Sequence, residues 1–170
     1  MTLTTILAAG AATLAIVAAG TLLLPRHVTV ERTALVDATP DAVLALASSS
    51  TGFQTFNPYL TTDPDLVIEP FGPETGIGAG FRFEGRDGTG TQTISAITAD
   101  AVTYAIDLGA MGQPTQTIIA TPEGDQTRVV WRVETDMGMN PIFRVFGLFM
   151  DRMLGGTYET GLANLARVAA

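Results

Sequence analysis

Alternation of apolar and polar residues runs through most of the chain after Arg26 and constrains the fold more than any other feature of the sequence. A period of two places one side of a strand in a core and the other in water, as in an antiparallel sheet. In Gln126–Met137, for example, Val129, Trp131 and Val133 alternate with charged residues. The strands that this pattern predicts are His27–Ala38, Leu66–Phe71, Ala79–Arg86, Gly90–Asp100, Ala101–Gly109, Pro114–Pro122 and Gln126–Met137.

A short helix is expected after the first strand. Thr39 suits an N-cap and Pro40 the first helical position, which predicts a helix from Pro40 to about Ser48. The segment that follows, Thr51–Asp65, contains two Xaa-Pro breakers and is expected to be a loop.

The C-terminal part is expected to be a long helix. Asn140 and Pro141 repeat the N-terminal signature, and apolar residues then recur at helical spacing as far as Val168. The pair Gly155-Gly156 within this segment predicts a bend or a close contact. The order of elements predicts an α+β fold, an antiparallel sheet with helices on one face.

A glycine-rich stretch at Gly72–Gly90 reads GPETGIGAGFRFEGRDGTG and raises the question of a phosphate site. A dinucleotide-binding motif needs a strand before the glycines and a helix N-terminus after them. Here the glycines precede an expected strand, and no Lys-Ser or Lys-Thr follows them. We therefore interpret Gly76 and Gly78 as turn residues at a curved sheet edge.

The N-terminal segment Leu3–Leu24 reads LTTILAAGAATLAIVAAGTLLL and carries no charge. As a helix, about 22 residues reach roughly 33 Å, enough to cross a hydrocarbon core. We therefore expect residues 1–25 to form a transmembrane anchor and residues 26–170 the folded domain. Arg26 and Arg32 follow the segment, which favours a cytoplasmic domain.

Two alternatives to the anchor stay open. A signal peptide cleaved near Ala18-Ala19-Gly20 would export the domain, although the segment lacks a basic n-region. The segment would otherwise be a buried helix of a soluble protein.

The composition excludes several classes of function. Hydrophobic residues make up 46% of the 170 residues and charged residues 15%, which suits one domain with a sizeable core. The net charge is −8 and all nine basic residues are Arg without a cluster, so nucleic acid is a poor partner. Because Cys and Lys are absent and His27 is the only His, thiolate, Schiff-base and Ser-His-Asp chemistry are unavailable to the folded domain. We expect no metal and no cofactor, and assign no catalytic residue.

Several motifs in a fixed order indicate a family. They read VTVERTALVDATPDAV, NPY, EPFGPETGIGAGFRFEG, TRVVWRVE and MDRMLGGTYETGLANLARV. From Val28 to Val168 the chain resembles the polyketide cyclase/dehydrase-related branch of the START/Bet v 1-like (SRPBCC) superfamily. The resemblance implies a helix-grip fold, a curved antiparallel sheet of about seven strands wrapped around a long C-terminal helix. It also implies a cavity for an apolar ligand.

The aromatic side chains are the candidates for lining this cavity. They are Phe53, Phe56, Tyr59, Phe81, Phe83, Tyr104, Trp131, Phe143, Phe146 and Phe149. Members of the branch often carry Trp in the loop that here contains Phe53, Phe56 and Tyr59. The resemblance therefore implies an aromatic loop but no ligand contact specific to Trp. The alternative is that the aromatic residues fill a closed core. For Phe143, Phe146 and Met150 a further alternative is an exposed lip near a membrane surface.

Three polar residues are also considered. Arg32 shares a face with Val30 in a regular strand and would need a carboxylate or a ligand anion there, but we favour the wet face for it, with Glu31 inward. Asp107 is the first candidate for acid/base chemistry, although alternation places its side chain on the other face of the strand from Tyr104. His27 is expected at the membrane interface rather than in catalysis.

We therefore expect a membrane-tethered binding module that holds an apolar small molecule or lipid in a cavity between sheet and helix. The alternative is a cyclase or dehydratase acting on a polyketide-like or aromatic substrate, which only the family resemblance supports. Whether the protein is an enzyme stays open, although the residues favour a binder. A third possibility is a protein-interaction domain with a filled core.

Overall fold

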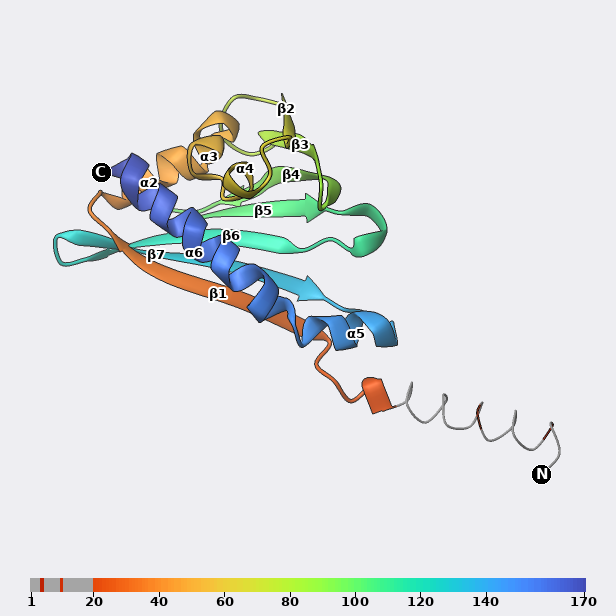
Figure 1. The fold of residues 1–170 in the computed structure, drawn as a ribbon. Coiled ribbons are helices and arrows are strands. Elements are labelled where there is room, and N and C mark those ends of the chain that lie inside the picture. Colours follow the sequence, from red (N-terminus) through yellow and green to blue (C-terminus); the bar gives the residue numbers. More distant parts are fainter. Residues whose placement is uncertain (1–3, 5–9, 11–19) are drawn as a thin grey trace.

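A computed structural model of the chain describes Thr4, Gly10 and residues 20–170 (Figure 1). Most of the expected anchor, Leu3–Leu24, lies outside these residues. Within the described residues, no helix has the length and apolarity needed to cross a membrane.

Seven strands form one antiparallel sheet, as the alternation predicts, and their order in it is β1-β7-β6-β5-β4-β3-β2 (Figure 1). The strand that begins the domain therefore pairs with the last strand, and the central hairpins follow one another outward. The strands are β1 (His27–Val36), β2 (Val67–Phe71), β3 (Gly80–Gly85), β4 (Gly88–Ile97), β5 (Ala101–Asp107), β6 (Thr115–Glu123) and β7 (Gln126–Asp136).

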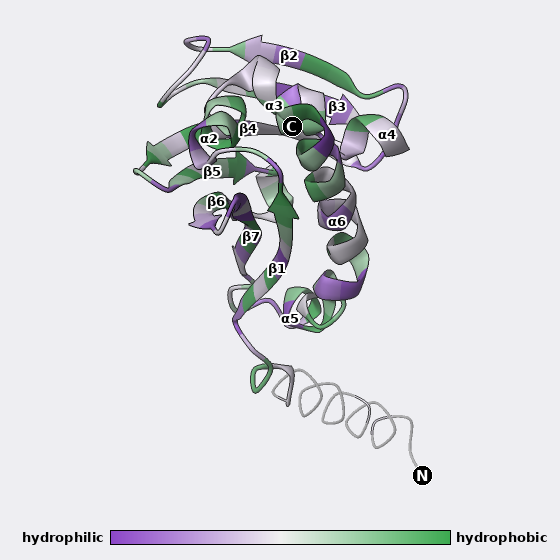
Figure 2. Cartoon of the chain, turned by 90° about the vertical axis from the view of Figure 1, so that its left-hand side faces the viewer, coloured by the Kyte–Doolittle hydropathy of each residue, from purple (hydrophilic) through white to green (hydrophobic). Residues whose placement is uncertain are grey.

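A 20-residue helix, α6 (Met150–Ala169), crosses the concave face of this sheet (Figures 1 and 2). Its inward residues Tyr158, Leu162 and Leu165 meet strand residues such as Val30 and Trp131 in one core cluster. The curved seven-stranded sheet and its C-terminal helix form the helix-grip fold that the family resemblance implies.

The predicted short helix is confirmed as α2 (Pro40–Ala47), where Oγ1 of Thr39 accepts a hydrogen bond from the N–H of Ala42 at 3.3 Å. The predicted loop Thr51–Asp65 is wrong in part. It contains α3 (Ser50–Phe56) and α4 (Tyr59–Thr62), and Ser49 caps α3 by accepting from the N–H of Gly52. Packing of Phe53 and Phe56 into the core stabilises a helix whose Gly and Thr residues have poor intrinsic propensity.

The C-terminal helix is divided, but not where its glycines predict a bend. α5 (Pro141–Gly147) ends before Leu148, and α6 begins at Met150 and continues through Gly155-Gly156. The predicted close contact is present at Gly155, which faces the side chain of Arg32.

The first part of the glycine-rich stretch, residues 72–79, forms the loop between β2 and β3, and the rest runs through β3 into the start of β4. Gly76 and Gly78 have φ of 86° and 89°, a region that favours glycine, and the N–H of Gly76 donates to the carbonyl of Ser48. The glycines therefore turn the chain at the sheet edge, as we interpreted them from the sequence.

Candidate ligand-binding site

Aromatic rings centred on Trp131 pack against one another between the sheet and α6. This residue is fully buried, and its ring stacks on that of Tyr158 from α6 with a centroid distance of 5.5 Å. Phe53 and Phe56 of α3 approach the same indole at 5.9 and 5.8 Å in edge-on geometry, a favourable arrangement for aromatic pairs. Three elements far apart in the sequence therefore meet at one side chain.

A second part of the same cluster lies on β3 and β5. The ring of Phe53 also contacts Phe81 and Tyr104, at 5.6 and 5.5 Å. The Tyr104 hydroxyl donates a hydrogen bond of 2.6 Å to the carbonyl of Ala47, at the end of α2. Burial raises the pKa of Tyr104 well above its usual range, so this hydroxyl stays a neutral donor.

Five of the ten predicted cavity residues come together in this cluster: Phe53, Phe56, Phe81, Tyr104 and Trp131. Phe83 is half-buried beside Phe81, with their ring centroids 6.3 Å apart, and Tyr59 lies at the rim. Phe143, Phe146 and Phe149 belong to α5 and the α5–α6 junction, and all three are exposed. Of the residues considered for an exposed lip, Met150 is buried.

Tyr158 is a member of the cluster that the aromatic prediction left out. The signal was present, because position 158 lies four residues from Leu154 and four from Leu162, on the apolar stripe of the C-terminal helix. One turn further, Gly161 lets α6 approach the sheet, since a Cβ at this position would lie 2.5 Å from the Trp131 ring.

Polar nitrogens without partners lie among these rings. Gln116 is directly opposite Tyr104 and Val133 in the sheet, and Gln92 is directly opposite Phe81, so both amides point to the inner face. Both residues are buried, and their side-chain nitrogens find no acceptor in the described part of the chain. The indole nitrogen of Trp131 is also buried and likewise has no acceptor among the described residues. Buried nitrogens of this kind are uncommon, because each forfeits its hydrogen bonds to water.

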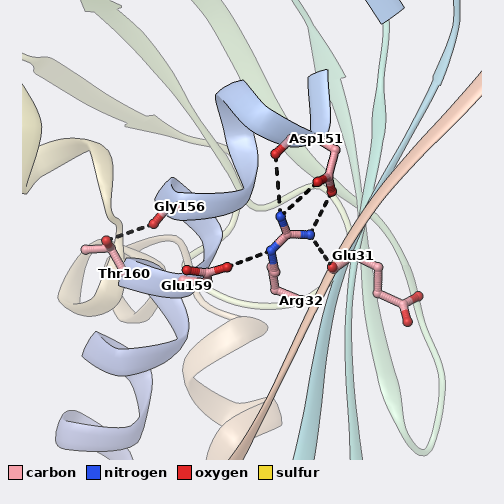
Figure 3. Close-up of polar contacts among 6 residues, drawn as sticks. All are labelled: Glu31, Arg32, Asp151, Gly156, Glu159 and Thr160. Atoms are coloured by element: carbon pink, nitrogen blue, oxygen red, sulfur yellow. Dashed lines mark hydrogen bonds and ion pairs between the residues drawn. The ribbon is translucent and has the colours of Figure 1, made fainter. Parts of the chain in front are cut away.

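Arg32 faces the helix, so the wet-face interpretation of this residue is wrong. It is opposite Trp131 in the sheet, and its guanidinium donates to Asp151 and Glu159 of α6, each at 2.8 Å (Figure 3). Glu31 points the other way and accepts from Arg132 at 2.7 Å on the outer face. The carboxylate partner that an inward Arg requires is therefore supplied by α6.

The remaining polar candidates lie away from the inner face. Asp107 is exposed, and its carboxylate accepts from the N–H of Gly109 at 2.8 Å. His27 is exposed at the start of β1. The described residues contain no group of three or more His, Cys, Asp or Glu side chains suited to a metal ion.

Among the described residues, two of the surface hollows are well defined. One, of about 240 Å³, lies where Pro25 and β1 meet α5, and Arg144 lines it. The other, of about 350 Å³, lies between the start of α2 and the β6–β7 turn. Neither lies between the sheet and α6, where the aromatic rings pack against one another.

A family model described as polyketide cyclase/dehydrase and lipid transport matches residues 27–170. The chain belongs to this family. The match covers the whole sheet, α3 and α6, which together form the aromatic cluster. A search of curated proteins found no match to this sequence.

Solved structures share the fold at low sequence identity. Truncated norcoclaurine synthase from Thalictrum flavum aligns with a TM-score of 0.66 and 14% identity, over 84% of this chain and 92% of the synthase. A protein from Nitrosospira multiformis aligns at 0.59 and 17%, over 84% and 96%. The di-domain ARO/CYC protein StfQ of the steffimycin biosynthetic pathway aligns at 0.58 and 14%, over 84% of this chain and 51% of StfQ. At these identities the likeness establishes the helix-grip fold and nothing more.

Proposed function

We propose that this family member is a membrane-tethered binding module that holds an apolar small molecule or lipid between the sheet and α6. The observation that carries the proposal is the set of buried, unpartnered nitrogens of Gln92, Gln116 and Trp131 on an aromatic inner face. A buried N–H without an acceptor is costly, and an oxygen atom of a ligand would supply the missing acceptor.

The chemistry of the inner face defines the class of ligand. Aromatic rings of Phe53, Phe81 and Trp131 suit a flat or flexible apolar body. The amide and indole donors suit carbonyl, ester or hydroxyl oxygens rather than a cation. Polyketides and lipids, the molecules in the family description, both combine an apolar body with such oxygens.

Binding requires some of the rings to separate, and α3 is the element best placed to move. It is seven residues long, lies outside the sheet, and contributes both Phe53 and Phe56. These two rings lie 4.8 Å apart and cover Trp131 together. A small displacement of α3 would thus expose the indole and the ring of Tyr104 to a ligand.

The cyclase or dehydratase alternative remains the second candidate. It needs an acid or base beside the substrate, and Asp107 points to a turn while Arg32 is held by two carboxylates of α6. No observation of the described residues favours this alternative over a binder.

The tether belongs to the same proposal. Leu3–Leu24 is uncharged and long enough to span a bilayer, and Arg26 and Arg32 after it favour a cytoplasmic domain. Arg144 donates hydrogen bonds to the carbonyls of Leu22 and Leu24 at 2.6 and 3.0 Å, which fixes the end of this segment to the domain. A protein that stays in the membrane pellet after carbonate extraction would support the tether, and a shorter soluble protein would indicate cleavage.

Native mass spectrometry of the detergent-extracted full-length protein tests the binding function. We expect a discrete apolar molecule bound once per chain, which solvent extraction then identifies. Because Trp131 is the only Trp, adding the extracted molecule back should change its emission. The variants Gln92→Met and Gln116→Met should weaken this response, whereas Gln113→Met, at an exposed position, serves as the matched control. An apo mass together with an emission spectrum that no apolar candidate changes would contradict the proposal.

A further inference from the structure

The helix α5 (Pro141–Gly147) buries its charged side chain and exposes its large apolar ones. Its one charged residue, Arg144, is buried with 7% exposure, while its large apolar residues face outward. Ile142 is 75% exposed and Phe146 46%. A helix on a protein surface normally has the opposite arrangement, with its apolar stripe facing the core.

The exposed apolar residues form one continuous surface, which we call the α5 face. It comprises Ile142, Phe143, Val145, Phe146, Leu148 and Phe149, and all six are exposed. Single apolar residues on a surface are ordinary, but a contiguous group of this kind marks a binding surface.

The buried Arg144 places the α5 face beside the exit of the N-terminal segment. Its guanidinium donates to the carbonyls of Leu22 and Leu24, and its Nε donates to the carbonyl of Gly138 at 2.9 Å. Both views of the fold show α5 at the end of the molecule where residues 20–26 join β1 (Figures 1 and 2). The charge that α5 carries is thus used to hold the chain that leads to the uncharged segment.

We propose that the α5 face lies in the surface of a lipid bilayer. The uncharged segment Leu3–Leu24 meets the domain at this point, so a bilayer that holds the segment would also contact the α5 face. Arg152, exposed in the first turn of α6, borders the face and would remain at the polar headgroups. This inference deepens the proposed function and rests on its tether, and the experiment below separates the two.

The absence of Cys allows the contact to be measured on the full-length protein. A single fluorophore is attached at Leu148→Cys in the α5 face or, as the matched control, at Asp125→Cys in the β6–β7 turn. Both positions are exposed, and the turn lies at the far end of the molecule from α5 (Figure 1). Each labelled protein is reconstituted in phosphatidylcholine vesicles that contain a lipid with a nitroxide on its acyl chain.

We expect the nitroxide lipid to quench the label at position 148 and to leave the label at position 125 bright. Aqueous iodide should give the reverse order. Changing Phe146→Glu and Phe149→Glu, two exposed positions whose substitution spares the core, should abolish quenching by lipid at position 148. Each substitution removes one aromatic side chain from lipid and should lower the partition of the α5 face into the bilayer about tenfold. The two together should therefore lower it about a hundredfold.

Each of the other outcomes decides between the α5 contact with lipid and the tether. A label at position 148 that iodide quenches as readily as the label at 125, in protein that resists carbonate, overturns the inference and leaves the tether. Lipid quenching at 148 in protein that carbonate releases supports the α5 contact and overturns the tether. A label shielded from both quenchers overturns the inference in favour of a protein partner, such as a second copy of this chain. Failure to associate with vesicles overturns both.

Discussion

The guanidinium of Arg32 occupies the space that a side chain at position 155 would need. Gly155 is buried against it, and a Cβ there would overlap the guanidinium, whereas a Cβ on Gly156 would meet nothing within 4 Å. The two carboxylates that hold Arg32 belong to Asp151 and Glu159, four residues before and four residues after Gly155. The three positions therefore form one stripe of α6, and the glycine is what lets the arginine lie between the carboxylates.

The two adjacent glycines give a matched test of this relationship. Ala is favoured over Gly in a helix interior by about 1 kcal/mol, so Gly156→Ala should raise the free energy of unfolding by up to that amount. Gly155→Ala should give a smaller gain than Gly156→Ala, because the guanidinium must leave its carboxylates to make room for the new Cβ. Urea unfolding of the two variants measures the difference.

Removal of the arginine provides the control. In an Arg32→Ala background the two substitutions should stabilise α6 to a similar extent, since the space beside Gly155 is then empty. Equal gains from both alanines in the presence of Arg32 would show that the guanidinium does not need this space.

Acid should weaken the fold through two aspartates, Asp136 at the end of β7 and Asp151 in the first turn of α6. Hydrogen bonds from Arg32 hold the pKa of Asp151 below its usual range, and those from Arg26 do the same for Asp136. As the pH falls below the ordinary aspartate pKa of about 3.9, the unfolded chain takes up protons before the native protein does. The stabilisation is therefore complete above that pH and is lost as the pH falls through the native pKa values.

The double variant Asp151→Asn and Asp136→Asn should flatten the dependence of unfolding free energy on pH in this acid range. Asp125→Asn, in the β6–β7 turn and without an ion pair among the described residues, is the control and should leave the slope unchanged. A slope in the double variant equal to that of the unchanged protein would contradict the assignment.

Alkaline pH should act through the tyrosines. The chain has three, Tyr59, Tyr104 and Tyr158, and burial raises the pKa of each. The unfolded chain releases its phenolic protons first, so this stabilisation is present below pH of about 10 and is lost above it. We expect the ultraviolet absorbance of phenolate to appear together with loss of the folded circular dichroism signal. Phenolate absorbance of all three tyrosines from a protein that remains folded would contradict the burial of Tyr104 and Tyr158.

Local patterns predict the sheet and its caps because these features depend on neighbouring residues. Alternation around Trp131 predicts β7, and the Thr39-Pro40 pair predicts the start of α2. α3 could not be predicted in this way, since its seven residues have little helix propensity and the helix depends on burial of Phe53 and Phe56.

The orientation of polar residues depended on partners distant in the sequence. Regular alternation in β1 places Arg32 beside Val30, but the carboxylates that make this position tolerable come from Asp151 and Glu159, more than a hundred residues later. Periodicity predicts that Ile142–Phe149 is helical, but it does not tell whether the apolar side chains face the core or the outside of the protein. The fold follows from the pattern, whereas the site and the α5 face required the arrangement in space.

The amide of Gln116 offers the last test, because stability and binding should change in opposite directions. Its side-chain nitrogen is buried without an acceptor, which costs about 1–3 kcal/mol relative to an apolar group of similar shape. Gln116→Met should therefore raise the free energy of unfolding of the ligand-free protein and lower its affinity for the co-purified molecule.

Denaturant unfolding without ligand and Trp131 titration with ligand measure the two effects, with the exposed Gln113→Met as the matched control. A Gln116→Met protein that is less stable than the unchanged protein would mean that the amide is satisfied in the native interior. The donor would then belong to the core, and the argument for a ligand oxygen at this position would fail. A more stable variant with unchanged affinity would place the ligand elsewhere on the inner face, so that the amide is a cost without a binding role.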